Sequence, residues 1–410
     1  MTRDACVLLD RADPLGAMRD QFVLDGGVIY LDGNSLGALS HPAIKQVRAL
    51  LEAEWGRGLI RSWNEAGWID APRRIGDKLA ALLGADPGEV IVADNTSVNL
   101  FKLLAGAARL RPERPVILTE VETFPTDLYL AAGVVDLLGG GREVRAVPRT
   151  ELRESLDGRV ALLMLTHVDY CSGYMHDMRA LTEAAHHAGA LVLWDLSHSA
   201  GAVPLNLNAC AVDLAVGCGY KYLNGGPGAP AYLYVSRHLQ PEMRSPLWGW
   251  MGHASPFDFS PTYAPGDGIA RYLCGTPPML AMAALEAALD LWLSVDLETA
   301  WRKSRALSEL LIRLVDERGA DLGFSVASPR DPWVRGSHVA IRHPEGYRIM
   351  RALIARGVIG DFRPPDLMRL ALTPLYTRFV DVWDAVDRLV EVVAGRAYEA
   401  PPYAQRLAVT

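Results

Sequence analysis

Hydrophobic runs alternate with amphipathic segments through the first three-quarters of the chain. Short apolar runs rich in β-branched residues predict strands at 28–31, 90–92, 115–118, 143–147, 160–165, 190–194, 214–216 and 231–235. Between several of these runs, apolar residues recur at helical spacing and predict helices at 98–108, 126–138 and 178–188. This alternation is typical of an α/β protein, so we expect a mostly parallel sheet with helices on both faces.

The pattern changes after the proline-rich segment Thr276-Pro277-Pro278. Helical patterns follow at 279–293, 297–318, 347–356 and 380–394, with short strands at 337–341 and 368–372. Because domain boundaries fall at such breaks, we expect three parts. These are an N-terminal segment at 1–40 that joins the small domain, a large α/β domain at 41–278, and a connecting helix with a small α+β domain at 279–410.

Composition narrows the class of protein. The 410 residues exceed the size of a single core, and a net charge of −7 argues against a protein that mainly binds nucleic acid. No leader-like start or long uncharged apolar stretch occurs, so we expect a cytoplasmic protein that does not enter membranes. The five cysteines form no C-x-x-C pair and the histidines show no H-E-x-x-H spacing, so neither disulfides nor a metal site is expected.

Two predicted strands are followed by, or end on, a residue whose side chain could take part in a reaction. Asp195 ends the run in LVLWDLSHSAG (191–201), and Lys221 follows the run in DLAVGCGYKYLNGGPGAP (213–230). Taken singly, Asp195 suits a turn and Lys221 suits a glycine-rich surface loop. Taken together they suit pyridoxal phosphate, because a carboxylate can hold the pyridine nitrogen protonated while a lysine binds the aldehyde carbon. We therefore expect an enzyme that acts on an amino acid.

Two further segments suit the same cofactor. In ADNTSVNLFKLL (93–104), Thr96 and Ser97 begin a predicted helix, whose N-terminus favours a phosphate. In ETFPTDLY (122–129), Phe124 is suited to stack on a flat ring and Asp127 to accept a hydrogen bond near it. Helix capping and core packing explain each segment equally well on its own.

Together with these residues, several motifs resemble the kynureninase family. They are LDGNSLG (31–37), FPTD (124–127), the Asp195-x-x-His198 spacing, YKYLN (220–224), GWMGH (249–253) and TPP (276–278). RSWNEAGW (61–68) and MRLALTPLY (368–376) resemble the bacterial form. The lysine segment alone resembles the wider fold-type I group, class V branch, of pyridoxal phosphate enzymes. The likeness runs from about residue 20 to about residue 395 and implies a seven-stranded type of sheet.

The resemblance implies a homodimer that cleaves the Cβ–Cγ bond of L-kynurenine with water, giving anthranilate and L-alanine in tryptophan degradation. Lys221 would be the Schiff-base lysine and the base at Cα, Asp195 the partner of the pyridine nitrogen, and Tyr220 a proton donor. The remaining cofactor contacts implied are Thr96, Ser97 and Tyr220 at the phosphate, Phe124 on the ring, Asp127, Thr166 and His198 beside it, and Trp250 and Thr276 from the neighbouring subunit. The implied substrate contacts are Arg369, which would bind the α-carboxylate, with Trp63 and Asn34.

Other functions stay open. An aromatic amino-acid aminotransferase of class V uses the same lysine, aspartate and arginine. A cysteine desulfurase-like lyase is disfavoured, because no cysteine follows Cys274 and Tyr220 stands where such enzymes carry histidine. Thr276, where animal kynureninases that favour 3-hydroxykynurenine carry asparagine, points to unhydroxylated kynurenine. A degradative role and a role in NAD biosynthesis are not distinguished.

Overall fold

A seven-stranded sheet forms the centre of the large domain. The computed structural model describes residues 1–24 and 26–407. The strand order is β2-β8-β7-β6-β5-β3-β4, and β8 runs antiparallel to both of its neighbours while every other pair is parallel. The strands are β2 Val90–Val92, β3 Val116–Glu120, β4 Glu143–Val147, β5 Val160–Thr166, β6 Leu191–Asp195, β7 Leu214–Gly217 and β8 Tyr232–Val235. The predicted α/β class and mostly parallel sheet are confirmed.

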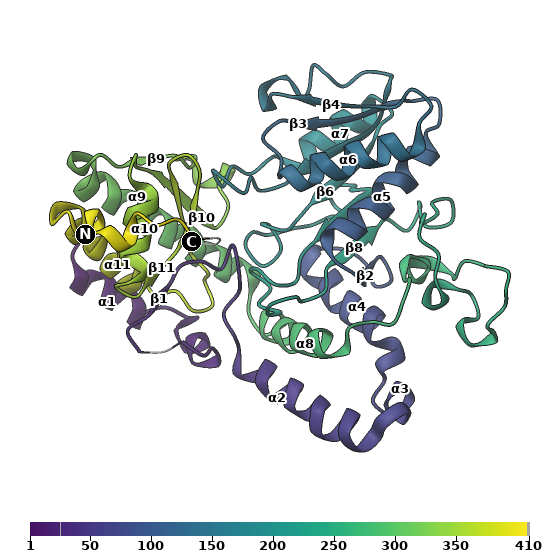
Figure 1. Cartoon of the computed structure of the whole chain (residues 1–410), viewed down its shortest axis with the longest axis horizontal. Coiled ribbons are helices and arrows are strands. Elements are labelled where there is room, and N and C mark those ends of the chain that lie inside the picture. The colour runs from purple at the N-terminus through teal and green to yellow at the C-terminus, as the bar shows by residue number, and fades with distance from the viewer. Residues whose placement is uncertain (25, 408–410) are drawn as a thin grey trace.

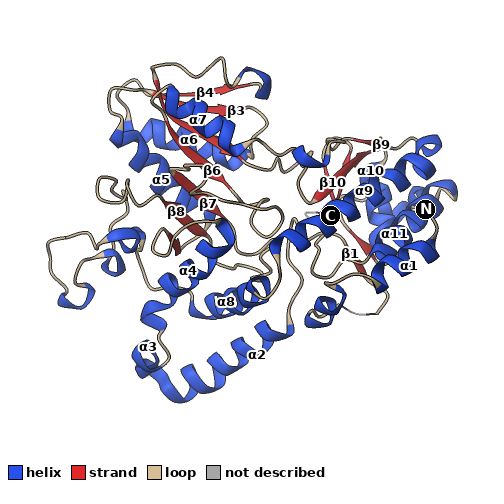
Figure 2. Ribbon diagram, turned by 180° about the vertical axis from the view of Figure 1, so that it is seen from behind, coloured by secondary structure: helices blue, strands red, loops and turns tan. Residues whose placement is uncertain are grey.

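Helices cover both faces of this sheet (Figure 2). Alternate residues of each central strand enter different cores, since Leu163 and Val192 pack with α4 and α7 while Leu162 and Leu193 pack with α5 and α6. The four helices are α4 Ala71–Leu83, α5 Thr96–Leu110, α6 Pro125–Leu138 and α7 Met178–His187. Burial on both faces explains why these strands are continuous apolar runs.

The small domain lies beside the large one (Figure 1). Its antiparallel sheet has the order β12-β13-β10-β9. Its elements are α1 Arg3–Arg11, α9 Leu297–Gly319, β9 Ser325–Val326, β10 His338–Arg342, α10 Gly346–Ile354, β11 Val358–Ile359, β12 Asp361–Arg363, β13 Leu367–Ala371 and α11 Phe379–Ala394. The run predicted as a strand at 28–31 is β1 Ile29–Tyr30, which pairs with β11 and not with the central sheet. Its apolar residues Ile29 and Leu31 enter the small-domain core.

A helical arm projects from the large domain along the lower edge of Figure 1. It consists of α2 His41–Ala49, a π-helix Leu50–Gly58 and α3 Ser62–Glu65. Helix α8 Met279–Leu293 packs against α2 and α4 and adds Leu285 and Leu289 to a core of the large domain. We propose the division at 1–40, 41–278 and 279–410, with α8 as the connector.

Short 3-10 turns complete the described chain at Gly16–Gln21, Leu59–Arg61, Trp68–Asp70, Arg149–Glu151, Trp250–Gly252, Pro256–Asp258, Gly268–Tyr272, Ala320–Leu322, Pro332–Val334, Ala397–Glu399 and Pro401–Tyr403. Within residues 1–24 and 26–407, no helix combines the length and apolar character needed to cross a membrane. The same residues contain no group of three or more histidine, cysteine or acidic side chains arranged to hold a metal ion.

Candidate active site

Lys221 lies just beyond the carboxyl end of β7, in a loop that other parts of the chain approach closely. Its Nζ is 3.0 Å from His198 Nε2 and 5.7 Å from the centre of the Tyr220 ring. The Gly37 N–H donates to the Tyr220 carbonyl at 2.8 Å. A Cβ at Gly37 would lie 2.3 Å from the Lys221 carbonyl, so only glycine permits this approach. The N-terminal loop is therefore held against the lysine backbone.

Asp195 ends β6, the strand next to β7, and its side chain is buried. One oxygen, Oδ1, accepts from the Ser197 N–H at 2.7 Å. Burial raises the pKa of Asp195, and the Ser197 hydrogen bond and the charge of Lys221 oppose that shift. Because a carboxylate has about four lone-pair positions, Asp195 keeps acceptor capacity for a further N–H donor.

Asp127 and Thr166 form a buried polar group next to Asp195. Thr166 Oγ1 donates to Asp127 Oδ2 at 3.3 Å and lies 2.8 Å from Thr123 Oγ1. Burial raises the pKa of Asp127, and the negative charge of Asp195 raises it further. The two carboxylates therefore favour having a proton, or a cationic partner, between them.

Thr96 and Ser97 form the first turn of α5. The side chain of Asn95 caps this helix by accepting from the Val98 N–H at 3.0 Å. Among the described residues, neither hydroxyl of Thr96 and Ser97 has a hydrogen-bond partner. Both stay available at a helix end that favours an anion.

Phe124 directly precedes α6, and 41% of its surface is exposed. Its ring meets Tyr170 edge-on at 5.1 Å between centroids. Together, these side chains fit pyridoxal phosphate, the cofactor expected from the sequence. They provide an amine for its aldehyde, a buried carboxylate for its ring nitrogen, a helix N-terminus for its phosphate and an exposed aromatic ring to stack on it.

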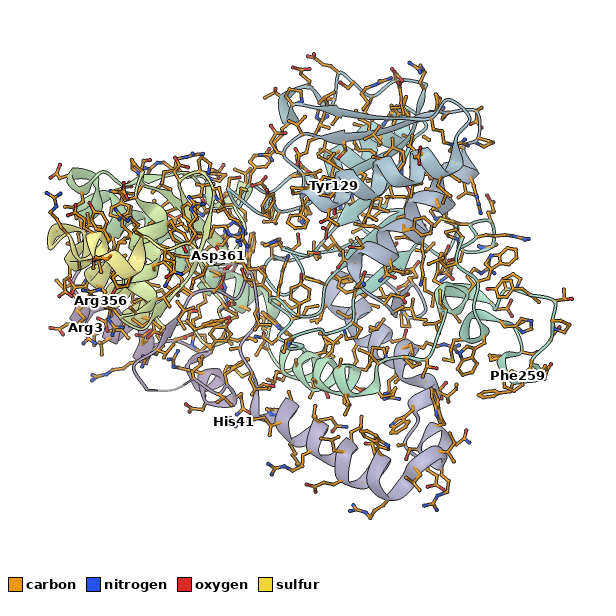
Figure 3. All side chains as sticks on the ribbon, in the orientation of Figure 1. Arg3, His41, Tyr129, Phe259, Arg356 and Asp361 are labelled. Carbon is orange, nitrogen blue, oxygen red and sulfur yellow. The ribbon has the colours of Figure 1, made fainter. Side chains whose placement is uncertain are left out.

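Arg369 lies in β13 of the small domain and is 1% exposed. Its Nε donates to Asp361 Oδ1 at 2.8 Å, and its Nη2 donates to Asp361 Oδ2. Nη1 donates to the Tyr170 carbonyl, and Nη2 also donates to Ser35 Oγ at 3.3 Å. Tyr170 thus touches both Phe124 and Arg369, which links the two parts of the site. Figure 3 shows Asp361 on the side of the small domain that faces the large domain.

The loop at 32–35 surrounds this arginine. With its amide oxygen turned towards the guanidinium, Asn34 accepts from Arg369 Nη2 at 3.1 Å and donates to Asp32 at 3.2 Å. Burial raises the pKa of Asp32 to about 7, and the charge of Asp361 adds to the shift. Burial also tends to raise the pKa of Asp361. The hydrogen bonds from Arg369 outweigh the effect of burial, so the pKa of Asp361 lies below its ordinary value. Asp361 is therefore the ionised partner of the arginine.

Three predicted site residues lie apart from these groups. Trp63 and Trp250 meet edge-on at 6.4 Å in an aromatic cluster with Trp68 and Phe257. Thr276 is exposed and lines a cavity of about 90 Å³ with Asp94 and Cys274. Within the described chain, no hydrogen bond or ring contact joins the three to Lys221 or Arg369. Their roles stay predictions.

Sequence reasoning did not single out Asp361, Ser35, Tyr170 or His338. Ser35 lies in the LDGNSLG segment, where only Asn34 was selected. Asp361 lies opposite Arg369 across a hairpin whose turn contains Pro364-Pro365. That proline pair, standing between two short runs, is a turn signal from which the hairpin and the pairing could have been inferred.

The fold and the lysine site define a class-V aminotransferase-type protein. Residues 29–320 match the family described as aminotransferase class-V. A cysteine desulfurase from Thermococcus onnurineus NA1 has a TM-score of 0.79 at 19% identity, covering 92% of this chain and 98% of its own. A C-DES variant with glycine covalently linked to its PLP cofactor has a TM-score of 0.81 at 19% identity, covering 91% and 99%. At this identity the likeness concerns the fold.

Relatives with higher sequence identity show which family of this fold the chain belongs to. Residues 301–389 match the family described as the kynureninase C-terminal domain. Proteins named kynureninase from Burkholderia pseudomallei strain 1106a and from Pseudomonas fluorescens are each 50% identical over 414 residues, covering 100% of both chains. The chain belongs to the kynureninase family.

Proposed function

We propose that this chain is a pyridoxal phosphate-dependent hydrolase that cleaves the Cβ–Cγ bond of L-kynurenine to give anthranilate and L-alanine. One observation carries the proposal. Asp195 ends β6, Lys221 lies just beyond the end of the neighbouring parallel strand β7, and the guanidinium of Arg369 is held in place by Asp361. Ligands of open α/β sheets bind at this edge, beyond the carboxyl ends of the strands. The 50% identity to proteins named kynureninase supports the choice of reaction.

The cofactor is pyridoxal 5′-phosphate, which when bound supplies an electron sink for charge that develops at the substrate Cα. Lys221 would anchor it, Asp195 would face its ring nitrogen, and Phe124 would cover its ring. Its phosphate would lie at the start of α5, with Thr96, Ser97 and Tyr220. Asp127, Thr166 and His198 would line the ring edge.

Substrate recognition rests on Arg369. A guanidinium presents a planar, permanently charged set of donors that matches an α-carboxylate. Asp361 holds its Nε side, so the substrate carboxylate would approach from the side occupied by Ser35, Asn34 and the Tyr170 carbonyl. We assign Arg369 and Asn34 to the carboxylate, and Trp63 to the aromatic end of the substrate.

Proton transfer falls to Lys221 and Tyr220. The Lys221 amine, when free, moves the proton at the substrate Cα, and His198 Nε2 lies within hydrogen-bond distance of that amine, at 3.0 Å. Tyr220 would supply a proton to the substrate Cβ as its bond to Cγ breaks, while water adds to the γ-carbonyl and the aryl fragment leaves as anthranilate. Burial raises the pKa of its hydroxyl, so the group keeps its proton at neutral pH until it is used.

We also propose a homodimer with shared active sites. Several large apolar side chains on the arm and on the 248–259 loop are 54–76% exposed, namely Trp55, Leu59, Ile60, Trp248, Phe257 and Phe259. Phe257 contacts both Phe259 and Trp250, and Trp250 contacts Trp63, so these rings form one continuous aromatic surface. Monomeric proteins rarely expose such patches. A second copy covering this surface would bring Trp250 and Thr276 to the partner's cofactor.

With five free cysteines, we place the enzyme in the cytoplasm.

The test is incubation of the cofactor-loaded protein with L-kynurenine. Anthranilate fluorescence together with equimolar L-alanine would support hydrolysis. A keto acid formed in place of alanine would show transamination and overturn the proposal. Adding 3-hydroxykynurenine in competition measures the preference expected from Thr276.

A further inference from the structure

Lys102 is a fully buried lysine in the middle of α5, the helix whose first turn contains Thr96 and Ser97. Side chains of a helix lean towards its N-terminus, so the Lys102 ammonium reaches back to the turn that precedes the helix. There its Nζ donates to Asp94 Oδ2. Burying an ion pair costs free energy that an apolar side chain would not, so stability alone does not explain a lysine at this position.

The same ammonium holds a second segment that is distant in the chain. Its Nζ donates to the Tyr272 carbonyl at 2.6 Å, the last carbonyl of the 3-10 turn Gly268–Tyr272. Burial raises the pKa of the Cys274 thiol, and the charge of Lys102 and a hydrogen bond from it oppose that rise. An ammonium has three N–H donors, and acceptors on Asp94, Tyr272 and Cys274 can take up all three. One buried cation therefore joins the two segments.

The first segment is the bend between β2 and α5. Asp94 has φ +49°, in the left-handed region that is unfavourable for a residue with a side chain. The hydrogen bond from Lys102 holds its carboxylate in this bend. The next residue, Asn95, caps α5, and Thr96 and Ser97 follow at once. The Lys102–Asp94 pair thus fixes the place where the first turn of α5 begins.

The second segment contains Thr276 and supports Trp250. Thr276 follows Cys274 by two residues. The Cys274 carbonyl accepts from the Met251 N–H at 3.2 Å, and a Cβ at Gly249 would lie 2.2 Å from the same carbonyl. These backbone contacts hold the 249–251 and 274–276 segments against each other, so an anchor at Tyr272 acts on both.

We propose that Lys102 is a positioning residue for the cofactor phosphate. It holds two sets of phosphate ligands at a fixed separation: the first turn of α5, which serves the site of the same subunit, and Trp250 with Thr276, which serve the site of the partner. By pairing with Asp94 it also neutralises a carboxylate just before that turn, where an unpaired negative charge would repel a phosphate. This role rests on the proposed function, because it takes pyridoxal phosphate as the ligand and a homodimer with shared sites.

The test compares pyridoxal phosphate with pyridoxal, which has the same aldehyde and ring but no phosphate. Each is titrated into the cofactor-free full chain, and the visible absorbance band that follows binding to lysine gives each Kd. In Lys102→Met, which keeps the length of the side chain without its charge, we expect the preference for pyridoxal phosphate over pyridoxal to fall about tenfold. Asp94→Asn keeps an acceptor for Lys102 and tolerates the positive φ, so it should lose less of this preference.

Lys303→Met is the matched control. Lys303 lies in α9, is 7% exposed and pairs with Asp13 at 2.6 Å. Within residues 1–24 and 26–407, no hydrogen bond or ion pair joins it to α5 or to the 272–276 segment. Its substitution removes a buried ion pair of the same kind, so it should lower the melting temperature and leave the preference between the two ligands at the wild-type value.

Several outcomes overturn the proposal. One is an unchanged preference in Lys102→Met, even with a lower melting temperature, because a purely structural lysine would affect both ligands alike. An equal change in Lys303→Met also overturns it, as does a wild-type chain that binds the two ligands equally well. If Lys102→Met does not fold, an unchanged preference in Asp94→Asn has the same force. If the wild-type preference depends on Lys102 but the chain cleaves no kynurenine, the role of Lys102 is supported and the proposed function fails.

Discussion

Asp361 and Arg369 lie directly opposite each other on the paired strands β12 and β13, and the carboxylate accepts hydrogen bonds from both Nε and Nη2 of the guanidinium. Both side chains are buried, so the orientation of the arginine is fixed before any substrate arrives. Such preorganisation reduces the entropy lost on binding.

Asp361→Asn should therefore weaken both the fold and substrate binding. A buried arginine left without its counter-charge costs about 3–5 kcal/mol. We expect urea unfolding to show a loss of that order and KM for L-kynurenine to rise more than kcat falls. Asp366→Asn is the control, because Asp366 pairs with the exposed Arg342 and should cost about 1 kcal/mol or less. Equal losses in the two variants would contradict the prediction.

Arg369→Lys should separate substrate binding from cofactor binding. Lysine keeps the charge but cannot donate bidentately, so we expect KM to rise about 100-fold, which corresponds to about 2.7 kcal/mol. The visible absorbance of the bound cofactor should stay, because Lys221 and Asp195 are untouched. Steady-state kinetics and an absorbance spectrum check both points. An unchanged KM would remove Arg369 from the substrate site.

Lys221→Ala should abolish both turnover and the visible absorbance band of lysine-bound pyridoxal phosphate. Lys45→Ala, at an exposed lysine of the arm, should leave both at wild-type values. Reduction with borohydride followed by peptide mapping should place the cofactor on the peptide that contains Lys221. Finding it on another lysine would refute the assignment.

The raised pKa of Asp32 predicts a pH-dependent stability. For an acid whose folded-state pKa lies near 7 and whose ordinary value is 3.8, the stabilisation is complete below pH 3.8 and is lost as the pH rises through 7. Asp32→Asn should remove this dependence, so the variant should gain on wild type by about 1–3 kcal/mol between pH 5 and pH 8. Urea unfolding at the two pH values measures the gain, and a parallel pH dependence in both proteins would contradict it.

The aromatic surface of the arm and loop predicts the oligomeric state. Phe259→Asp would place a charge within the proposed contact between copies, and Phe259 lies at the outer end of the loop (Figure 3). We expect sedimentation analysis to give a dimer for wild type and mostly monomer for the variant, with activity falling as Trp250 and Thr276 leave the partner's site. Tyr129→Asp, at an exposed ring on α6, should stay dimeric. A monomeric, fully active wild type would rule out shared active sites.

The parts of the site predicted from sequence are those set by strand ends. Asp195 and Lys221 follow continuous apolar runs, and parallel strands bring their carboxyl ends to one edge of a sheet, so local pattern and topology agree. The side chains that hold Arg369 depend on tertiary register. Asp361 lies in a three-residue strand that follows Gly360 and ends just before Pro364, and such a strand carries too few residues for a periodic signal. In the sequence His338 is indistinguishable from any other strand residue, because its contact with His198 exists only once the two domains are packed together.

The helical arm was missed for a different reason. Ile44, Leu51 and Trp55 are exposed, so the apolar positions of this segment do not mark a face buried within the chain. An amphipathic helix is recognised from sequence by an apolar face buried against the rest of the chain, and this segment leaves several of its large apolar side chains exposed.

The loop at 31–37 forms hydrogen bonds to both halves of the site. Its Ser35 holds Arg369 and Asp361, and two residues later the Gly37 N–H holds the Tyr220 carbonyl next to Lys221. Only three residues, 35–37, therefore separate the contacts to the arginine from the contact to the backbone beside the lysine. With Arg369 as the proposed carboxylate site, an amino acid that lacks the carboxylate should be processed slowly even when it is present in excess.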